Sequence, residues 1–174
     1  MTPITQLISD TNLDQYLETK EDKAFFHSKG EHYDLLSTIS QQYNNIRIYD
    51  IGTYKGQSAL ALSSNQTNLV ISYDIRYFVH VKQPTNMEVR IGNFYYDSEM
   101  LKSPLIMFDI DPHNGNDERQ FVDNLISQNY KGTVVFDDIH LNDGMKKFWS
   151  SITQEKYDYT HLGHWSGTGV VIFK

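Results

Sequence analysis

The chain has 174 residues, of which 39% are hydrophobic, and this size suits one compact domain with its own core. Its formal net charge of −7 argues against nucleic acid as the main partner, because that affinity depends on clustered Lys and Arg. The lack of cysteine excludes disulfide and thiolate chemistry. No apolar run approaches the roughly 20 residues of a membrane-spanning helix. Residues 1–6 lack the features of a signal peptide, so we expect a cytoplasmic protein with no membrane partner.

The first 45 residues are predicted to be mostly helical. Capping residues at positions 9–11 precede a first helix that runs to about residue 18, with Leu13 and Leu17 on one face. Residues 19–30 are polar around two phenylalanines and form either a second short helix or a mobile cover over a site. Leucines and isoleucine at helical spacing predict a stronger helix over residues 31–43.

Five short strands rich in β-branched and aromatic residues follow, with helices among them. The strands are predicted over residues 46–51, 69–74, 87–91, 105–109 and 133–136. The helices are predicted over residues 57–63, 115–129 and 144–152. The apolar stripe of the last helix is assigned to the core, as is usual for amphipathic helices.

The end of the chain changes character. Two further strands, over residues 157–162 and 169–173, are separated by too few residues for a crossover helix, which predicts an antiparallel hairpin. Together these elements predict an α/β, Rossmann-like doubly wound fold with a seven-stranded, mostly parallel sheet. We expect one domain over residues 1–174, with a helical cover at 1–30 and a ligand-binding core at 31–174. Ligands should bind at the carboxyl ends of the strands.

A glycine-containing turn joins the first strand to a helix, and it organises the predicted site. Gly52 and Gly56 allow backbone conformations and a close ligand approach that a Cβ atom would block. Backbone N–H groups at such a turn suit a polar or anionic ligand group. The spacing Gly-x-x-x-Gly matches neither the dinucleotide fingerprint nor the P-loop, so no phosphate cradle is predicted.

Four of the predicted strands end in aspartates, namely Asp50, Asp74, Asp109 and the pair Asp137 and Asp138. Any one of them is commonly a turn residue or a helix cap. Gathered on one edge of a parallel sheet, however, they repel one another unless a cation or hydroxyl groups hold them. Asp74 follows the glycine turn by about twenty residues, where an acid can bind both hydroxyls of a ribose. A ribose-bearing ligand without phosphates, such as S-adenosylmethionine, fits this pattern.

The segment from Asp50 to Ser58 resembles the first motif of the class I S-adenosylmethionine-dependent methyltransferases. Asp74 matches their ribose-binding acid, and the terminal hairpin matches their antiparallel seventh strand. Within that class, residues 108–113 and 132–140 are similar to the metal-dependent O-methyltransferases, meaning the catechol O-methyltransferase group and the macrocin-type sugar O-methyltransferases. The resemblance covers residues 31–174.

The resemblance implies S-adenosylmethionine and magnesium as cofactors. Asn93 follows the third strand, at the position from which this class commonly contacts adenine. The implied cofactor-binding residues are Asp50, Gly52, Thr53, Tyr54, Gly56, Ser58, Asp74, Asn93 and Asp109. The implied magnesium ligands are Asp109, Asp137 and Asp138. Asp111 could replace Asp109, because the family pattern is usually Asp-Gly-Asp-His and Pro112 here precedes the histidine.

The chemistry of these residue types agrees with the resemblance. Magnesium prefers oxygen ligands, and a hydroxyl bound to it is more acidic and is held near the donor methyl group. Methyl transfer is an in-line displacement that depends mostly on positioning. A general base is still useful, and the catalytic candidates are His113 first and His140 second. The other histidines are expected to be solvated or packing residues: His27, His32, His80, His161 and His164.

We therefore predict a methyltransferase that acts on a hydroxyl of a small molecule or sugar with the help of magnesium. Only residues 1–30 and 163–169 are available to shape the acceptor pocket. The acceptor is therefore small, or a neighbouring subunit of a homo-oligomer completes the pocket, or the site is open to a glycan. Two alternatives remain: a metal-independent methyltransferase of the same fold, and a non-catalytic module that binds S-adenosylmethionine or a nucleoside.

Overall fold

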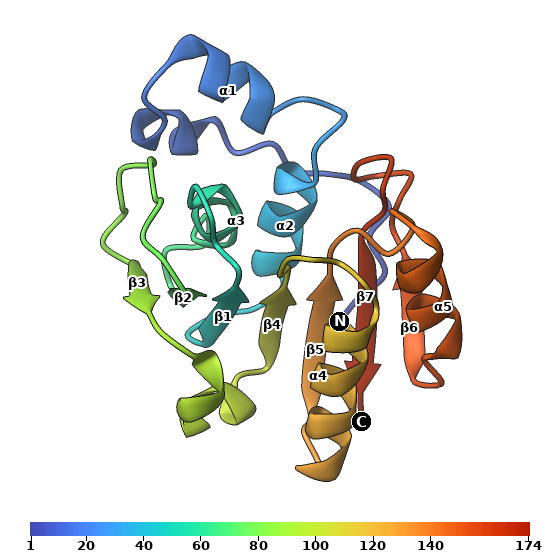
Figure 1. The fold of residues 1–174 in the computed structure, drawn as a ribbon. Helices are drawn as coiled ribbons and strands as arrows, with labels where there is room; N and C mark the ends of the chain where they lie inside the picture. Colours follow the sequence, from blue (N-terminus) through green and yellow to red (C-terminus); the bar gives the residue numbers. More distant parts are fainter.

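The computed structural model describes residues 1–174, apart from the side chain of Thr11. Its centre is one seven-stranded sheet with the strand order β3-β2-β1-β4-β5-β7-β6 (Figure 1). Neighbouring strands from β3 to β5 are parallel, while β7 runs antiparallel to both β5 and β6. The strands are β1 (Arg47–Ile51), β2 (Leu69–Asp74), β3 (Met87–Ile91), β4 (Leu105–Phe108), β5 (Gly132–Phe136), β6 (Glu155–Asp158) and β7 (Gly169–Phe173). This architecture confirms the predicted fold class.

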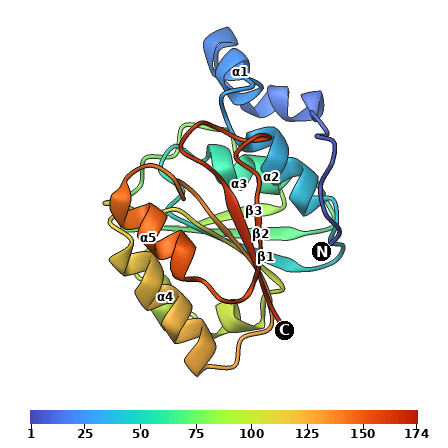
Figure 2. The same cartoon turned by 90° about the vertical axis from the view of Figure 1, so that its right-hand side faces the viewer.

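Helices cover both faces of the sheet, so that there are two hydrophobic cores (Figure 2). One core lies under α4 (Asn116–Ser127) and α5 (Asp143–Ser151), and the other under α2 (Tyr33–Ser40) and α3 (Gln57–Leu62). Side chains of each strand alternate between them, as the pleat requires. In β1, for example, Tyr49 and Ile51 join the first core and Ile48 joins the second.

The N-terminal segment packs on the α2 and α3 side of the molecule. It contains a 3-10 helix, η1 (Thr11–Tyr16), and the short helix α1 (Lys20–Phe26), which lie above α2 and α3 in Figure 1. The apolar side chains of Ile4, Leu13 and Phe26 are buried in the second core. None of the described helices is long and apolar enough to cross a lipid bilayer.

The largest differences from the predicted elements lie at the two ends of the chain. The first predicted helix is a shorter 3-10 helix, and residues 19–30 contain α1, which starts with a capping box between Thr19 and Asp22. The strand predicted over residues 157–162 is β6 and ends at Asp158. There the Asp158 carboxylate accepts a hydrogen bond from the Thr160 N–H at 3.0 Å, an Asx turn that stops the strand.

A partly buried carboxylate anchors the connection between β3 and β4, which contains η2 (Phe94–Tyr96) and η3 (Ser98–Lys102). Asp97 Oδ2 accepts hydrogen bonds from the hydroxyls of Tyr49 and Tyr73 at 2.9 and 3.0 Å, and from Arg90 Nη1 at 2.8 Å. Burial opposes its ionisation, but the hydrogen bonds and the charge of Arg90 outweigh burial and hold the pKa of Asp97 below its ordinary value. One carboxylate therefore ties the connection to three neighbouring strands.

Asp97→Asn should lower the free energy of unfolding by about 2 kcal/mol, because hydrogen bonds to a charged group each contribute roughly 1.5–3 kcal/mol. Since the folded pKa of Asp97 is lowered, its contribution is complete above the ordinary pKa of an unfolded aspartate and is lost as the pH falls through the folded value. Urea unfolding across acidic pH should therefore show a smaller deficit at low pH. The exposed control Lys102→Ala should stay within about 0.5 kcal/mol of the parent. A pH-independent deficit would contradict the charge-based account.

Candidate functional site

The turn after β1 lies directly against the loop after β4 because Gly52 has no side chain. Gly52 has a φ of 91°, and a Cβ atom there would lie 1.6 Å from the Asp109 carbonyl oxygen. The Gly52 N–H donates to the Tyr73 carbonyl at 2.8 Å, and the Tyr54 N–H donates to Asp74 Oδ2 at 2.9 Å. These N–H groups are thus bound within the protein, and the turn forms a wall of the site.

A cavity of about 560 Å³ opens at the carboxyl ends of β1 to β4. This volume lies within the range of roughly 300–1,000 Å³ that is common for sites of small ligands and cofactors. The cavity is lined by residues at the ends of these strands or just after them: Ile51, Gly52, Tyr54, Tyr73, Asp74, Ile75, Arg76, Phe78, Gly92, Phe94, Asp109, Ile110, Asp111 and His113.

One part of the cavity places large apolar side chains beside a carboxylate. Tyr54, Ile75 and Phe78 are large exposed side chains, and the rings of Tyr54 and Phe78 lie 6.0 Å apart. Exposed aromatic faces of this kind suit a planar ligand group such as a purine. Asp74 lies beside them, and its two oxygens accept hydrogen bonds from the N–H groups of Tyr54 and Arg76 at 2.9 and 3.2 Å. A carboxylate oxygen has two lone pairs, so Asp74 can also accept from ligand hydroxyls.

Four of the nine residues predicted to bind the cofactor line this cavity, namely Gly52, Tyr54, Asp74 and Asp109. Asp50 lies below the turn, fully buried, and accepts a hydrogen bond from the Ser72 hydroxyl at 2.7 Å. Burial raises its pKa.

The remaining four predicted cofactor residues lie outside the cavity lining as well. Thr53 and Ser58 are buried, and Gly56 leaves room for the packed side chains of Val79 and Val81. Asn93 is exposed, and its side chain accepts a hydrogen bond from the Tyr95 N–H at 2.9 Å. The cavity wall at this point is formed by its neighbours in sequence, Gly92 and Phe94.

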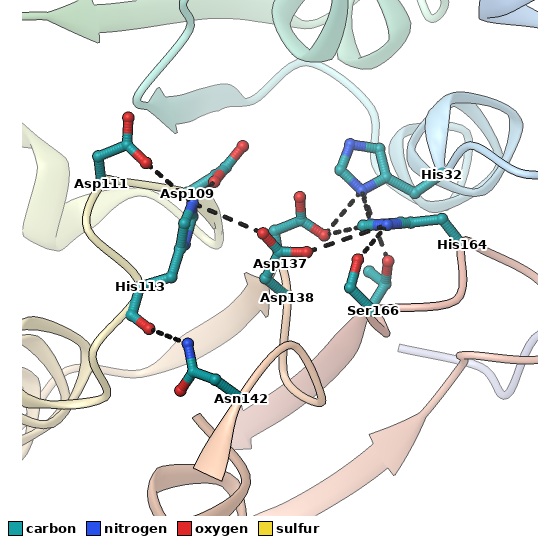
Figure 3. Close-up of polar contacts among 10 residues, drawn as sticks. His32, Asp109, Asp111, His113, Asp137, Asp138, Asn142, His164 and Ser166 are labelled. Carbon is teal, nitrogen blue, oxygen red and sulfur yellow. Dashed lines mark hydrogen bonds and ion pairs between the residues drawn. The ribbon is translucent and has the colours of Figure 1, made fainter. Parts of the chain in front are cut away.

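The other end of the cavity meets a cluster of acids and histidines at the ends of β4 and β5 (Figure 3). His113 Nε2 lies 3.6 Å from Asp109 Oδ1 and 3.5 Å from Asp138 Oδ2. It also lies 3.5 Å from Asp111 Oδ1, but the Asp111 side chain is 97% exposed, against 28% for Asp109. Asp109 is therefore the more buried of the two acids that the loop after β4 places at the site. Burial and the charges of Asp137 and Asp138 raise the pKa of Asp109 well above its usual value.

At three positions around the site, the backbone adopts conformations that ordinary residues avoid. Tyr54, His113 and Asp138 have φ values of 45°, 49° and 56°, in the left-handed region. Non-glycine residues in this region are uncommon, and such strain collects at functional sites. All three side chains come from turns that follow strands of the sheet, which is where the parallel topology predicts binding.

Asn142 is a positioning residue that the sequence analysis did not single out. Its Oδ1 caps α5 by accepting from the Met145 N–H at 3.0 Å, and its Nδ2 donates to the His113 carbonyl at 2.8 Å. The start of α5 thus holds the loop that carries His113. Its sequence signal is the ordinary Asn before a helix, which indicates a cap but not the second contact.

Asp137 points away from His113 and contacts His32 and His164, which the sequence analysis predicts to be solvated or packing residues. Its Oδ1 lies 3.0 Å from His32 Nδ1 and 2.6 Å from His164 Nε2. In the described part of the chain, these three side chains are the set whose candidate metal-ligand atoms all lie within 4.8 Å of one another. The predicted magnesium triad of Asp109, Asp137 and Asp138 is not gathered as tightly.

His140, the second candidate base, does not reach this cluster. Its Nε2 lies 2.7 Å from Asp158 Oδ2, at the end of β6. The structure therefore leaves His113 as the predicted base that lines the cavity.

Known proteins resemble this chain in fold and not in sequence. No family model matches the chain. No curated protein matches it in sequence either. Solved structures do match: a methyltransferase from Podospora anserina bound to S-adenosylhomocysteine has a TM-score of 0.61 and 14% identity, over 98% of this chain and 90% of that one. The chain therefore shares its fold with a methyltransferase that binds S-adenosylhomocysteine.

Two further structures with this methyltransferase fold are similar over almost the whole chain. The O-methyltransferase TomG from Streptomyces achromogenes, involved in tomaymycin synthesis and bound to S-adenosylmethionine, has a TM-score of 0.58 and 13% identity, over 97% of this chain and 92% of that one. The O-methyltransferase from Bacillus cereus, in complex with S-adenosylhomocysteine, has a TM-score of 0.56 and 13% identity, over 96% and 92%. The fold-level resemblance inferred from residues 31–174 is thereby confirmed.

Gly52→Ala should destabilise the protein by about 3 kcal/mol or more, because the new Cβ would overlap a backbone oxygen and also disfavour the φ of 91°. For a chain of this length the melting temperature should then fall by about 6–12 °C. The matched control is Gly30→Ala, where the nearest atom would lie 3.9 Å from the Cβ. Equal melting temperatures for the two variants would show that the turn does not depend on this close approach.

Proposed function

We propose that this protein is an S-adenosylmethionine-dependent methyltransferase that methylates a hydroxyl oxygen of a small molecule or sugar. The observation that carries the proposal is that one cavity holds Asp74 beside exposed aromatic rings and also reaches His113 and its acids. The methyltransferase fold supports the proposal, since S-adenosylmethionine or S-adenosylhomocysteine is bound in the similar structures described above. We assign residues 1–174 to one domain, with 1–30 as a cover over the core at 31–174.

In this proposal the cofactor lies along the ends of β1 to β4. Its ribose hydroxyls bind Asp74, and its adenine packs among Tyr54, Ile75 and Phe78. The methyl end then extends toward Asp109 and the loop after β4. The predicted cofactor residues outside the cavity lining are assigned to supporting the surrounding turns: Asp50, Thr53, Gly56, Ser58 and Asn93.

The reaction is an in-line displacement at the methyl carbon. The acceptor oxygen forms the new carbon–oxygen bond while the sulfur–carbon bond breaks, and S-adenosylhomocysteine leaves with the electron pair. The acceptor proton passes to His113 Nε2. Asp109 and Asp138, at 3.6 and 3.5 Å from that nitrogen, stabilise the imidazolium that forms. Most of the acceleration then comes from holding the oxygen in line with the methyl group.

A divalent cation also fits the acids at this end of the cavity. Burial and, after it, the charges of Asp137 and Asp138 raise the pKa of Asp109, and a cation would offset those charges. Magnesium on Asp109, Asp137 and Asp138 is the predicted form, but magnesium prefers oxygen ligands alone, whereas imidazoles contact each of these acids. A bound cation would lower the pKa of the acceptor hydroxyl. The proposed proton transfer to His113 does not require a bound cation.

Asp74→Asn should raise the Kd for S-adenosylmethionine by at least about 10-fold, because a hydrogen bond to a charged acceptor contributes roughly 1.5–3 kcal/mol. Isothermal titration calorimetry measures this directly, and circular dichroism checks that the variant folds. The control is Asp123→Asn, an exposed acid on α4 that does not line the cavity. Absence of binding by the parent protein would overturn the proposed function, and equal affinities for parent and Asp74→Asn would overturn the role of Asp74.

His113→Gln should lower the rate of methyl transfer by about 10²–10⁴-fold, which is the usual contribution of a positioned general base. The Kd for S-adenosylmethionine should change little, so that the loss appears in kcat. The assay follows labelled methyl groups from S-adenosylmethionine into a panel of catechols and sugars, with and without a metal chelator.

The control for this assay is His161→Gln, since His161 is an exposed histidine that does not line the cavity. A His113→Gln variant as active as the parent would exclude His113 as the base. A parent protein that binds S-adenosylmethionine but labels no acceptor in the panel would favour the non-catalytic binding module. Unchanged turnover with the chelator would favour the metal-independent methyltransferase.

A further inference from the structure

Three side chains from distant parts of the chain converge on one point beside the proposed active site (Figure 3). His32 is the residue before α2, Asp137 follows β5, and His164 lies in the loop between β6 and β7. Asp137 Oδ1 lies 3.0 Å from His32 Nδ1 and 2.6 Å from His164 Nε2, and the two nitrogens lie 3.1 Å apart. All three side chains are buried: that of His32 is 5% exposed, that of Asp137 8% and that of His164 12%.

Hydrogen bonds can account for at most two of the three contacts in this triangle. Each imidazole nitrogen that faces the centre can carry at most one hydrogen atom, and the ionised carboxylate is only an acceptor. If both nitrogens donate to Asp137 Oδ1, their own contact at 3.1 Å has no hydrogen between them. If one nitrogen donates its hydrogen atom to the other nitrogen, then one of the two contacts with the carboxylate has no hydrogen atom. A cation at the centre satisfies all three atoms together.

The spacing of the three atoms matches ligands of one metal ion. With bonds of about 2.1 Å, two ligands at a right angle around an ion are separated by about 3 Å. The observed separations of 2.6, 3.0 and 3.1 Å correspond to three ligands on one face of an octahedron. Two histidines and one carboxylate in this facial arrangement are a known ligand set for transition metals.

The second ring nitrogen of His164 has a hydrogen-bond partner of its own. Ser166 Oγ lies 2.7 Å from His164 Nδ1, on the side of the ring away from the triangle. Histidine ligands usually donate their second ring N–H to such a partner, which fixes the tautomer and directs the other nitrogen to the metal. With Nδ1–H donating to Ser166, His164 Nε2 presents a lone pair to the centre.

We propose that His32, Asp137 and His164 form a binding site for a divalent transition-metal ion such as Fe²⁺ or Co²⁺. Two imidazole ligands favour these ions over magnesium, which prefers oxygen. The site differs from the predicted magnesium triad in two of its three ligands and shares only Asp137 with it. Because the site is assigned from its own ligand geometry, it stands whether or not the protein transfers methyl groups.

The test is to titrate chelator-treated full-length protein, without S-adenosylmethionine, with Co²⁺ and with Mg²⁺. Calorimetry should give one Co²⁺ per chain, with an affinity at least about 100-fold higher than that for Mg²⁺. The visible absorption of bound Co²⁺ gives a second readout. His32→Gln and His164→Gln should each weaken Co²⁺ binding by at least about 100-fold. Ser166→Ala, which keeps all three ligands, should weaken it by about 10–100-fold, the usual effect of losing an outer hydrogen-bond partner.

The matched control is His27→Gln, because His27 also contacts two carboxylates but through different nitrogens, Asp14 at 2.8 Å and Asp34 at 3.1 Å. Because the two carboxylates contact opposite nitrogens of the ring, they cannot bind one metal ion together with His27. The affinity for Co²⁺ should therefore not change. Circular dichroism verifies that each variant is folded. Equal affinities for Co²⁺ and Mg²⁺ that survive the loss of His32 and His164 would overturn the proposal in favour of an oxygen-only site. No binding of either ion by the folded parent would overturn it outright.

Discussion

The site depends on how the protein keeps several carboxylates close together at the ends of β4 and β5. Asp109 contacts His113, and burial together with the charges of Asp137 and Asp138 raises its pKa. Burial also opposes the ionisation of Asp137, but His32 and its partner His164 outweigh burial and lower the pKa of Asp137. Neighbouring carboxylates are thus driven apart in pKa by what contacts them, which is the usual way in which one cluster supplies groups with different roles.

The fold and the edge that carries these acids could be predicted because both follow from local patterns. β2 and β3 have the predicted bounds, and alternating strands and helices require a parallel sheet whose carboxyl ends share an edge. Strand register sets the limit of that prediction. Asp50 pairs with Met107 and with Ser72, so it lies two residues, or about 7 Å, below the level of Asp109 and Asp74. Four strands that end in aspartates therefore do not present four equivalent side chains.

His32 and His164 could not be predicted because nothing local marks them. They are separated by 132 residues and meet only when the loop between β6 and β7 folds over the start of α2. Neither belongs to a motif with metal-ligand spacing, and single histidines are more often packing or solvated residues. The contact of Asn142 with His113 is similar, since the sequence indicates the cap but not the loop that the same side chain holds. Long-range contacts between loops are therefore what the structure adds to the sequence.

Asp138 connects the two halves of the site. One of its oxygens lies 3.5 Å from His113 Nε2, at the end of the cavity, and the other lies 4.0 Å from His164 Nδ1, beside the histidine triangle. The triangle itself contributes no residue to the cavity lining, so S-adenosylmethionine and a metal ion would contact separate sets of side chains. Only the Asp138 carboxylate would then separate an acceptor oxygen in contact with His113 from the metal site. The two ligands are therefore separable in binding measurements, and their sites come closest at Asp138, between His113 and His164.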